Sequence, residues 1–257
     1  MAIERYIDQT LLRQDATEDE AAVFCEEAVK NNFRGICISP CFAGLAREVV
    51  GNSGVQVGSV VGFPLGNSLH ETKLKELSYL SVLDVDDIDF VWNVGLFKSR
   101  KGSAFETDRF QNELREVAQF CQDRNIVSKC IVETSFLTKD EKLEAFWEVW
   151  EAGFDFIKTS TGFFGAAQLE DINLWSEERD QSGLTLLIKA SGGIKDLETT
   201  RLFVEAGADL IGTSQGVRIL QEELNEAKLD SKRDRSLCKN NNPKPSGPVQ
   251  DTKEQTH

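Results

Sequence analysis

The sequence predicts an α/β protein built as a single-domain (β/α)8 TIM barrel, in which eight parallel strands each precede a helix. Short apolar runs alternate with longer amphipathic stretches, and the apolar runs are typical of strands buried on both faces. Eight strand–helix units fit within about 225 residues, a typical length for a closed barrel. An open doubly wound sheet is the alternative, but its usual glycine fingerprint after the first strand is absent.

The eight predicted strands are short runs rich in β-branched and aromatic residues. In chain order they cover residues 6–10, 35–39, 56–62, 87–93, 127–133, 154–159, 184–190 and 208–212. An amphipathic pattern that predicts a helix follows each of them. These helices cover residues 18–31, 41–50, 70–83, 103–124, 139–152, 168–180, 197–205 and 215–225.

Helix boundary signals support this division of the chain. Thr138 and Glu141 have capping-box spacing at the start of the helix predicted over 139–152. Gly153 and Gly207 follow predicted helices at positions suited to C-terminal caps. From Lys228 onward the sequence is polar and lacks aromatic residues. We therefore predict a barrel domain over 1–227 and a disordered tail over 228–257.

Composition limits the classes of function. The formal net charge of −14 argues against nucleic acid or an anionic membrane as the main partner, although it allows a small anionic substrate. No apolar segment approaches the roughly 20 residues of a membrane helix, and the N-terminus does not resemble a signal peptide. The six cysteines include no CxxC pair and mostly lie among apolar neighbours, which is typical of a reducing, cytoplasmic compartment.

Several common catalytic devices are missing from the sequence. The two histidines, His70 and His257, make a zinc site of the His/Cys type or a Ser-His-Asp triad improbable. Neither a GxGxxG motif nor a P-loop is present. We therefore expect no metal and no nucleotide cofactor held by these motifs.

Lysines follow two of the apolar runs, and small or hydroxyl residues follow each lysine. They are Lys158 and Lys189, on neighbouring predicted strands. Taken singly, each has an alternative interpretation as a strand-end lysine that reaches into solvent. Together they favour a shared pocket, where burial and mutual repulsion lower the proton affinity of both amines. A neutral amine near pH 7 is a nucleophile, so the pair predicts amine-based catalysis.

Carboxylates accompany the lysines. Asp89 lies within the apolar run Ile88-Asp89-Phe90 and therefore needs a partner when buried. It could form a structural salt bridge or cap, or it could serve a lysine and transfer protons through a water. We expect Asp86 and Asp87 to be solvated loop acids. Asp8 lies near the end of the first strand, at the mouth of the predicted barrel.

Glycines and hydroxyl residues follow the last two strands, where barrel enzymes often bind phosphate. Gly192-Gly193 follows the seventh strand, and Gly212-Thr213-Ser214 ends the eighth. Ordinary tight turns are the alternative interpretation. Because both segments occur on neighbouring strands, they favour a phosphate subsite.

Six strings, in order along nearly all of the predicted folded part, resemble the deoxyribose-phosphate aldolase family. They are Ile7-Asp8-Gln9-Thr10-Leu11-Leu12, Val61-Gly62-Phe63-Pro64-Leu65-Gly66, Asp87-Ile88-Asp89, Lys158-Thr159-Ser160-Thr161-Gly162, Lys189-Ala190-Ser191-Gly192-Gly193-Ile194 and Ile211-Gly212-Thr213-Ser214. The resemblance implies a class I aldolase on a (β/α)8 barrel. That family reversibly cleaves 2-deoxy-D-ribose 5-phosphate to acetaldehyde and D-glyceraldehyde 3-phosphate and uses no metal or other cofactor.

The resemblance also implies a role for each matching residue. Lys158 corresponds to the Schiff-base lysine, Lys189 to the second lysine that lowers its proton affinity, and Asp89 to the proton-relay acid. The residues implied to bind the substrate and its phosphate are Asp8, Thr161, Gly162, Gly192, Gly193 and Ser214. The implied partner is a small phosphorylated sugar, and a homo-oligomer is the expected assembly.

The sequence departs from the family pattern in three places. Gln9 replaces a usual histidine, the loop 163–168 is about one residue shorter than usual, and Arg100, which we expect to be solvated, replaces a common glycine. These departures concern the phosphate end and the sugar specificity. Two alternative functions are therefore a non-catalytic sugar-phosphate-binding barrel and a lysine aldolase for another phosphorylated sugar.

Overall fold

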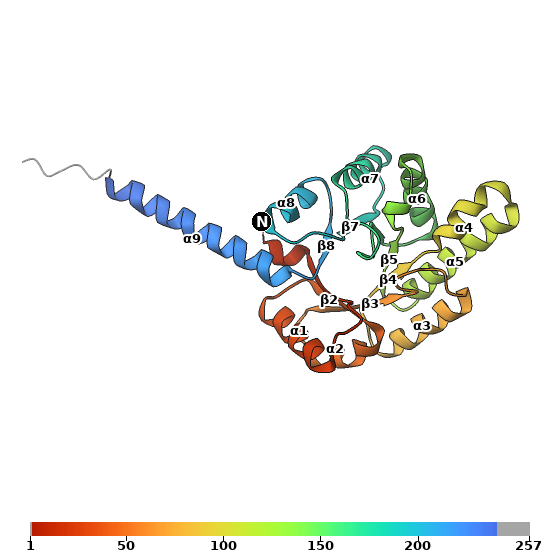
Figure 1. The fold of residues 1–257 in the computed structure, drawn as a ribbon, viewed down its shortest axis with the longest axis horizontal. Coiled ribbons are helices and arrows are strands. Elements are labelled where there is room, and N and C mark those ends of the chain that lie inside the picture. The colour runs from red at the N-terminus through yellow and green to blue at the C-terminus, as the bar shows by residue number, and fades with distance from the viewer. Residues whose placement is uncertain (1, 241–257) are drawn as a thin grey trace, which may run out of the picture.

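A computed structural model describes residues 2–240 as a closed barrel of eight parallel strands (Figure 1). Each strand pairs with the next in the sequence, and β8 pairs with β1 to close the barrel. The fold class predicted from the sequence is thus confirmed. The strands are β1 (Ile7–Leu11), β2 (Gly35–Ile38), β3 (Gln56–Val61), β4 (Asp87–Val91), β5 (Val127–Ile131), β6 (Phe156–Lys158), β7 (Leu187–Ser191) and β8 (Leu210–Thr213).

Helices surround the strands (Figure 1). All eight predicted helices are present, and the described residues add a short helix after β4 that the sequence analysis missed. The α-helices are α1 (Glu18–Lys30), α2 (Ala43–Val50), α3 (His70–Val82), α4 (Val94–Ser99), α5 (Ala104–Gln122), α6 (Lys139–Ala152), α7 (Leu169–Ser182), α8 (Leu197–Glu205) and α9 (Gly216–Asn240). Four 3-10 turns occur at Ile3–Tyr6, Pro40–Phe42, Arg100–Gly102 and Thr134–Phe136.

The predicted boundary signals act as expected. The Thr138 hydroxyl accepts a hydrogen bond from the Glu141 N–H, and the Glu141 carboxylate accepts one from the Thr138 N–H, which completes the capping box of α6. Gly153 ends the same helix with a φ of +91°, a left-handed conformation that glycine adopts without steric cost.

The strands place apolar and charged side chains on opposite faces. Because side chains alternate along a strand, Ile88 and Phe90 of β4 point outward into the apolar layer beneath the helices, and Asp87 and Asp89 point into the barrel. The same alternation puts Lys129 of β5 inside the barrel and Cys130 outside it. The apolar core therefore lies between strands and helices, and the barrel interior carries charge.

The C-terminal helix α9 projects away from the barrel (Figure 1). It extends to Asn240, beyond the end predicted at residue 225, and so includes the first part of the segment predicted to be a disordered tail. The remainder of that segment, 241–257, lies outside the described residues, and the domain boundary stays a prediction. None of the described helices is long and apolar enough to cross a membrane.

Candidate active site

A cavity of about 360 Å³ opens at the C-terminal end of the barrel. The structure brings six of the predicted site residues to its wall: Lys158, Thr161, Gly162, Gly192, Gly193 and Ser214. The other three predicted residues, Asp8, Asp89 and Lys189, are buried inside the barrel. The prediction that Asp8 lies at the barrel mouth is wrong, because Asp8 is the second residue of β1 and does not line the cavity. Lys195 and Arg13 also line the cavity, and the sequence analysis identified neither as a site residue.

The two lysines lie side by side in register on β6 and β7. Lys158 is 3% exposed and Lys189 is fully buried, so neither is a solvent-directed strand-end lysine. Both ammonium groups donate to the same carboxylate oxygen, Asp89 Oδ2, at 2.5 Å from Lys158 Nζ and 2.8 Å from Lys189 Nζ. Of the four buried lysines among the described residues, only Lys158 reaches the cavity.

Asp89 stays ionised in this setting. Burial opposes its charge, but the ammonium groups of Lys158, Lys189 and Lys129 hold the pKa of Asp89 well below its usual range. Cys37 Sγ lies 3.7 Å from Asp89 Oδ2 and donates to it. Burial raises the pKa of the Cys37 thiol to about 12, so Cys37 remains protonated at neutral pH. Asp89 is therefore an anion that faces cations and one thiol.

Lys189 is a permanent cation, which corrects one expectation. We expected burial and repulsion to weaken proton binding by both lysines. Burial does oppose the charge of Lys189, but the carboxylates of Asp8 and Asp89 outweigh it and raise the pKa of Lys189 above its ordinary value. Asp8 Oδ2 lies 2.7 Å from Lys189 Nζ. The pKa of Asp8 falls to about 2, because Lys189, Arg34 and Lys129 outweigh the effect of its burial.

The prediction that Asp87 is a solvated loop acid is wrong. Its side chain is fully buried and lies 3.0 Å from Lys129 Nζ, and it accepts hydrogen bonds from Arg34. Asp86 is half-buried, and accepts from the Val57 N–H and from Arg47. The sequence analysis identified neither Arg34 nor Lys129. Lys129 could have been found from the sequence, because it is a charged residue within the strand 127–131, as Lys158 is at the end of its strand.

Glu133 fixes the loop that follows Lys158. Its buried carboxylate accepts hydrogen bonds from the N–H (3.0 Å) and the hydroxyl of Thr161. The Thr161 hydroxyl in turn accepts from the Phe163 N–H at 3.2 Å. Thr161 thus orders the loop, because its own donors are already used. The N–H groups of Gly162 and Gly193 have no acceptor among the described residues.

Backbone geometry at the predicted phosphate end requires glycine. Gly162, Gly192 and Gly193 all have positive φ, at +85°, +103° and +79°. A Cβ on Gly192 would lie 2.8 Å from the carbonyl oxygen of Gly165, so the loops after β6 and β7 approach closely only without a side chain. Gln9 takes no part in this region, since its Oε1 accepts from the Gly216 N–H at 2.8 Å, at the start of α9.

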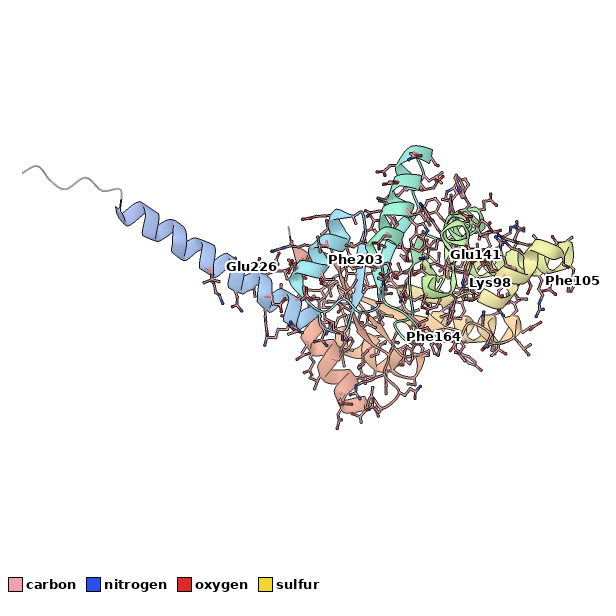
Figure 2. The ribbon with its side chains drawn as sticks, turned by 45° about the horizontal axis from the view of Figure 1, so that its top comes forward. Lys98, Phe105, Glu141, Phe164, Phe203 and Glu226 are labelled. Atoms are coloured by element: carbon pink, nitrogen blue, oxygen red, sulfur yellow. The ribbon has the colours of Figure 1, made fainter. Side chains whose placement is uncertain are left out.

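Two basic residues after β4 lie outside the site. Arg100 is 9% exposed, which corrects the expectation that it is solvated. It donates to Glu144 and to Glu148 of α6 and stacks over the Phe97 ring. Lys98 of α4 forms an ion pair with Glu141 of α6 at 2.8 Å, and the two residues lie together in Figure 2. Both residues therefore hold α4 against α6.

The family model of the DeoC/LacD family aldolases matches residues 3–222. This chain belongs to the DeoC/LacD aldolase family. It is therefore an aldolase, a lyase. A curated relative, the deoxyribose-phosphate aldolase of Caldanaerobacter subterraneus subsp. tengcongensis, is 42% identical over 224 residues, which cover 86% of this chain and 94% of the relative.

Solved structures of aldolases agree with the family assignment. The structure titled "QR15, an Aldolase" superposes with a TM-score of 0.81 at 36% identity. The match covers 88% of this chain and 98% of the QR15 chain. The tetrameric deoxyribose phosphate aldolase from Aeropyrum pernix superposes with a TM-score of 0.77 at 28% identity, over 85% of this chain and 89% of its own.

Proposed function

We propose that this DeoC/LacD aldolase is a class I enzyme that reversibly cleaves 2-deoxy-D-ribose 5-phosphate to acetaldehyde and D-glyceraldehyde 3-phosphate through a Schiff base on Lys158. One observation carries the proposal: Lys158 is the one buried lysine of the described residues that borders the cavity, and it lies beside the permanent cation Lys189. The curated relatives named deoxyribose-phosphate aldolase support the choice of substrate.

In the proposed reaction, the neutral Lys158 amine attacks the C1 aldehyde of the open-chain sugar, and water leaves to give a protonated imine. The C3 hydroxyl loses its proton, the C2–C3 bond breaks, and its electron pair moves toward the imine nitrogen to form an enamine. D-Glyceraldehyde 3-phosphate leaves with C3–C5. Protonation of the enamine at C2 and hydrolysis of the imine release acetaldehyde and restore the amine.

The buried charges suit both stages of this reaction. Lys189 disfavours a second positive charge on the free Lys158 amine, which helps the amine to attack. Once the cationic imine forms, the Asp89 carboxylate beside it stabilises the positive charge. Asp89 also contacts the lysine nitrogen directly, which is the position that a proton-relay group requires.

We place the substrate phosphate against Gly162, Gly192, Gly193 and Ser214, the predicted residues that line the same cavity as Lys158. Lys195 borders this region, and its side chain has no ion-pair partner among the described residues. Arg13 also borders the cavity but is held by Asp15 and Glu20. Lys195 is therefore the side-chain cation best placed to meet a dianionic phosphate.

Lys195→Ala is expected to raise KM for deoxyribose 5-phosphate about tenfold, the effect of one partly exposed charge-assisted contact, with little change in kcat. KM for unphosphorylated 2-deoxyribose should stay unchanged, because that sugar offers the lysine no anion. Steady-state kinetics with both sugars measures the difference. Lys139→Ala, which removes an exposed lysine outside the cavity, is the matched control. An equal KM increase for both sugars would contradict the assignment.

Borohydride reduction in the presence of acetaldehyde tests the proposed function directly. Reduction of the imine should leave a stable ethyl group on Lys158, which peptide mass spectrometry locates. Folded protein that forms no adduct would favour the non-catalytic sugar-phosphate binder. The other alternative is a lysine aldolase for a different phosphorylated sugar. Comparing the turnover of deoxyribose 5-phosphate with that of other aldose and ketose phosphates tests it, and faster turnover of another sugar phosphate would favour this alternative.

We also propose that the enzyme is cytoplasmic and forms a homo-oligomer. Five cysteines of the described residues form no disulfide, and all of them except Cys41 are buried, which supports the first part. The tetrameric Aeropyrum pernix aldolase supports the second. Sedimentation of the full chain measures the assembly state.

A further inference from the structure

Six buried or half-buried charges inside the barrel form a closed ring in which acids and bases alternate. Each neighbouring pair is an ion pair. The order is Asp89, Lys189, Asp8, Arg34, Asp87, Lys129 and back to Asp89. The N–O distances around this charge ring include 2.8 Å for Lys189–Asp89, 2.7 Å for Lys189–Asp8, 3.0 Å for Lys129–Asp87 and 3.2 Å for Lys129–Asp89.

The charge ring crosses the barrel from one end toward the other. Arg34 immediately precedes β2 and Asp87 begins β4, so both lie at the N-terminal end of the strands. Asp89 lies further along β4 and contacts Lys158, the last residue of β6. Arg34 has 22% of its side chain exposed, whereas each of the other five ring members has at most 2%. The ring thus links the far end of the barrel to the cavity lysine.

Three inward-facing glycines leave the space that the ring occupies. A Cβ on Gly35 would lie 2.9 Å from Asp8 Oδ1, and one on Gly58 would lie 3.1 Å from Asp87 Cβ. A Cβ on Gly212 would lie 3.2 Å from Lys189 Cε. Larger residues on β2, β3 and β8 would displace members of the ring. The barrel interior is therefore built to hold these charges in contact.

We propose that this ring sets the charge balance around Lys158, and that Arg34, Asp87 and Lys129 are positioning residues for the reaction although none of them reaches the cavity. The ring contains three acids and three bases, so it is neutral as a unit. Lys158 is attached to it only through Asp89. A change of one charge anywhere in the ring alters how strongly the buried surroundings favour a charged or a neutral amine. The inference rests on the proposed role of Lys158.

Charged groups face Lys158 from several strands. Asp89 of β4 and Lys189 of β7 are its near neighbours, and Cys37 of β2 presents a neutral thiol beside the same carboxylate. Lys129 of β5 pairs with the other carboxylate oxygen of Asp89, Oδ1. Asp8 of β1 does not contact Lys158 itself but forms an ion pair with Lys189. All of these groups except Lys158 and Cys37 belong to the ring, so the ring controls the local field.

Two variants at the far end of the barrel should move the pH profile in opposite directions. Asp87→Asn removes a negative charge, favours the neutral amine and moves the acid limb of kcat/KM to lower pH. Arg34→Met removes a positive charge, favours the protonated amine and moves the acid limb to higher pH. Each shift should be about half to one pH unit, as expected for one charge acting over several ångströms in a partly screened interior. Lys129→Gln should shift the limb in the same direction as Arg34→Met.

The rate of borohydride-trapped ethyl adduct formation on Lys158, measured against pH, gives a readout independent of turnover. Arg34→Lys keeps the charge and should keep the wild-type profile. Asp86→Asn is the matched control, because Asp86 neighbours Asp87 in sequence but pairs with Arg47 outside the ring. Its profile should also match the wild type.

Shifts of the same sign in Asp87→Asn and Arg34→Met, or no shift in either, would overturn the proposal. Thermal unfolding shows which variants are folded, and Lys129→Gln replaces Arg34→Met in the comparison should the latter not fold. Failure of the proposed function has a different signature, since the wild-type enzyme would then form no adduct on Lys158 at any pH.

Discussion

Replacing Lys158 with alanine should lower kcat/KM for deoxyribose 5-phosphate by at least about 10⁴-fold, because no other described residue offers a buried amine at the cavity. The fold should persist. Asp89 keeps Lys189 and Lys129 as partners, so the substitution leaves no unpaired buried charge. The truncated side chain borders a cavity, and its loss should cost about 1–2 kcal/mol of unfolding free energy.

Lys158→Arg separates the nucleophile from the charge. An arginine keeps a cation near Asp89 but remains protonated and cannot form the imine. It should be as inactive as Lys158→Ala, and borohydride should trap no adduct at this position in either variant. Steady-state kinetics and peptide mass spectrometry provide the two measurements. Activity of Lys158→Ala above about 1% of wild type, with the folded state intact, would remove Lys158 from the mechanism.

The sequence was sufficient to predict the fold, because strand periodicity is a local property. Each strand alternates or remains apolar over a short run, and several helices carry their own side-chain cap, as Thr138 and Glu141 show for α6. The order of strands in a closed barrel then follows the order in the chain. The short α4 was missed because its sequence, VGLFKS, is too short to show a helical period.

Electrostatic partners were harder to predict, because they depend on which side chains meet across strands. Asp87 looks like a loop acid from its neighbours in sequence, yet register places it opposite Gly58 and beside β5, where Lys129 reaches it. The charge of Lys189 depends on Asp8, which is distant in the sequence and comes close only when β8 closes on β1. Thr161 likewise matched a binding motif in the sequence. Only the structure shows that its N–H and its hydroxyl both donate to the Glu133 carboxylate.

Lys189→Leu should lower kcat/KM at pH 7 by about 10²- to 10³-fold and move its acid limb to higher pH. The sign follows from the charges. Lys189 has a raised pKa and is cationic throughout the neutral range, so its loss removes one positive charge directly beside Lys158. The protonated amine is then favoured, and a higher pH is needed to obtain the nucleophile. This shift should exceed that of Arg34→Met, because Lys189 shares a carboxylate oxygen with Lys158.

A second substitution tests whether charge or shape causes this effect. Lys189→Leu leaves Asp8 and Asp89 without a shared cation, so the ring carries one net negative charge. Adding Asp8→Asn removes that excess and should return the acid limb toward its wild-type position, even where the rate itself stays low. pH profiles of the single and double variants measure the coupling. A profile in Lys189→Leu that matches the wild type, or a double variant that shifts further to alkaline pH, would show that Lys189 acts on Lys158 by packing rather than by its charge.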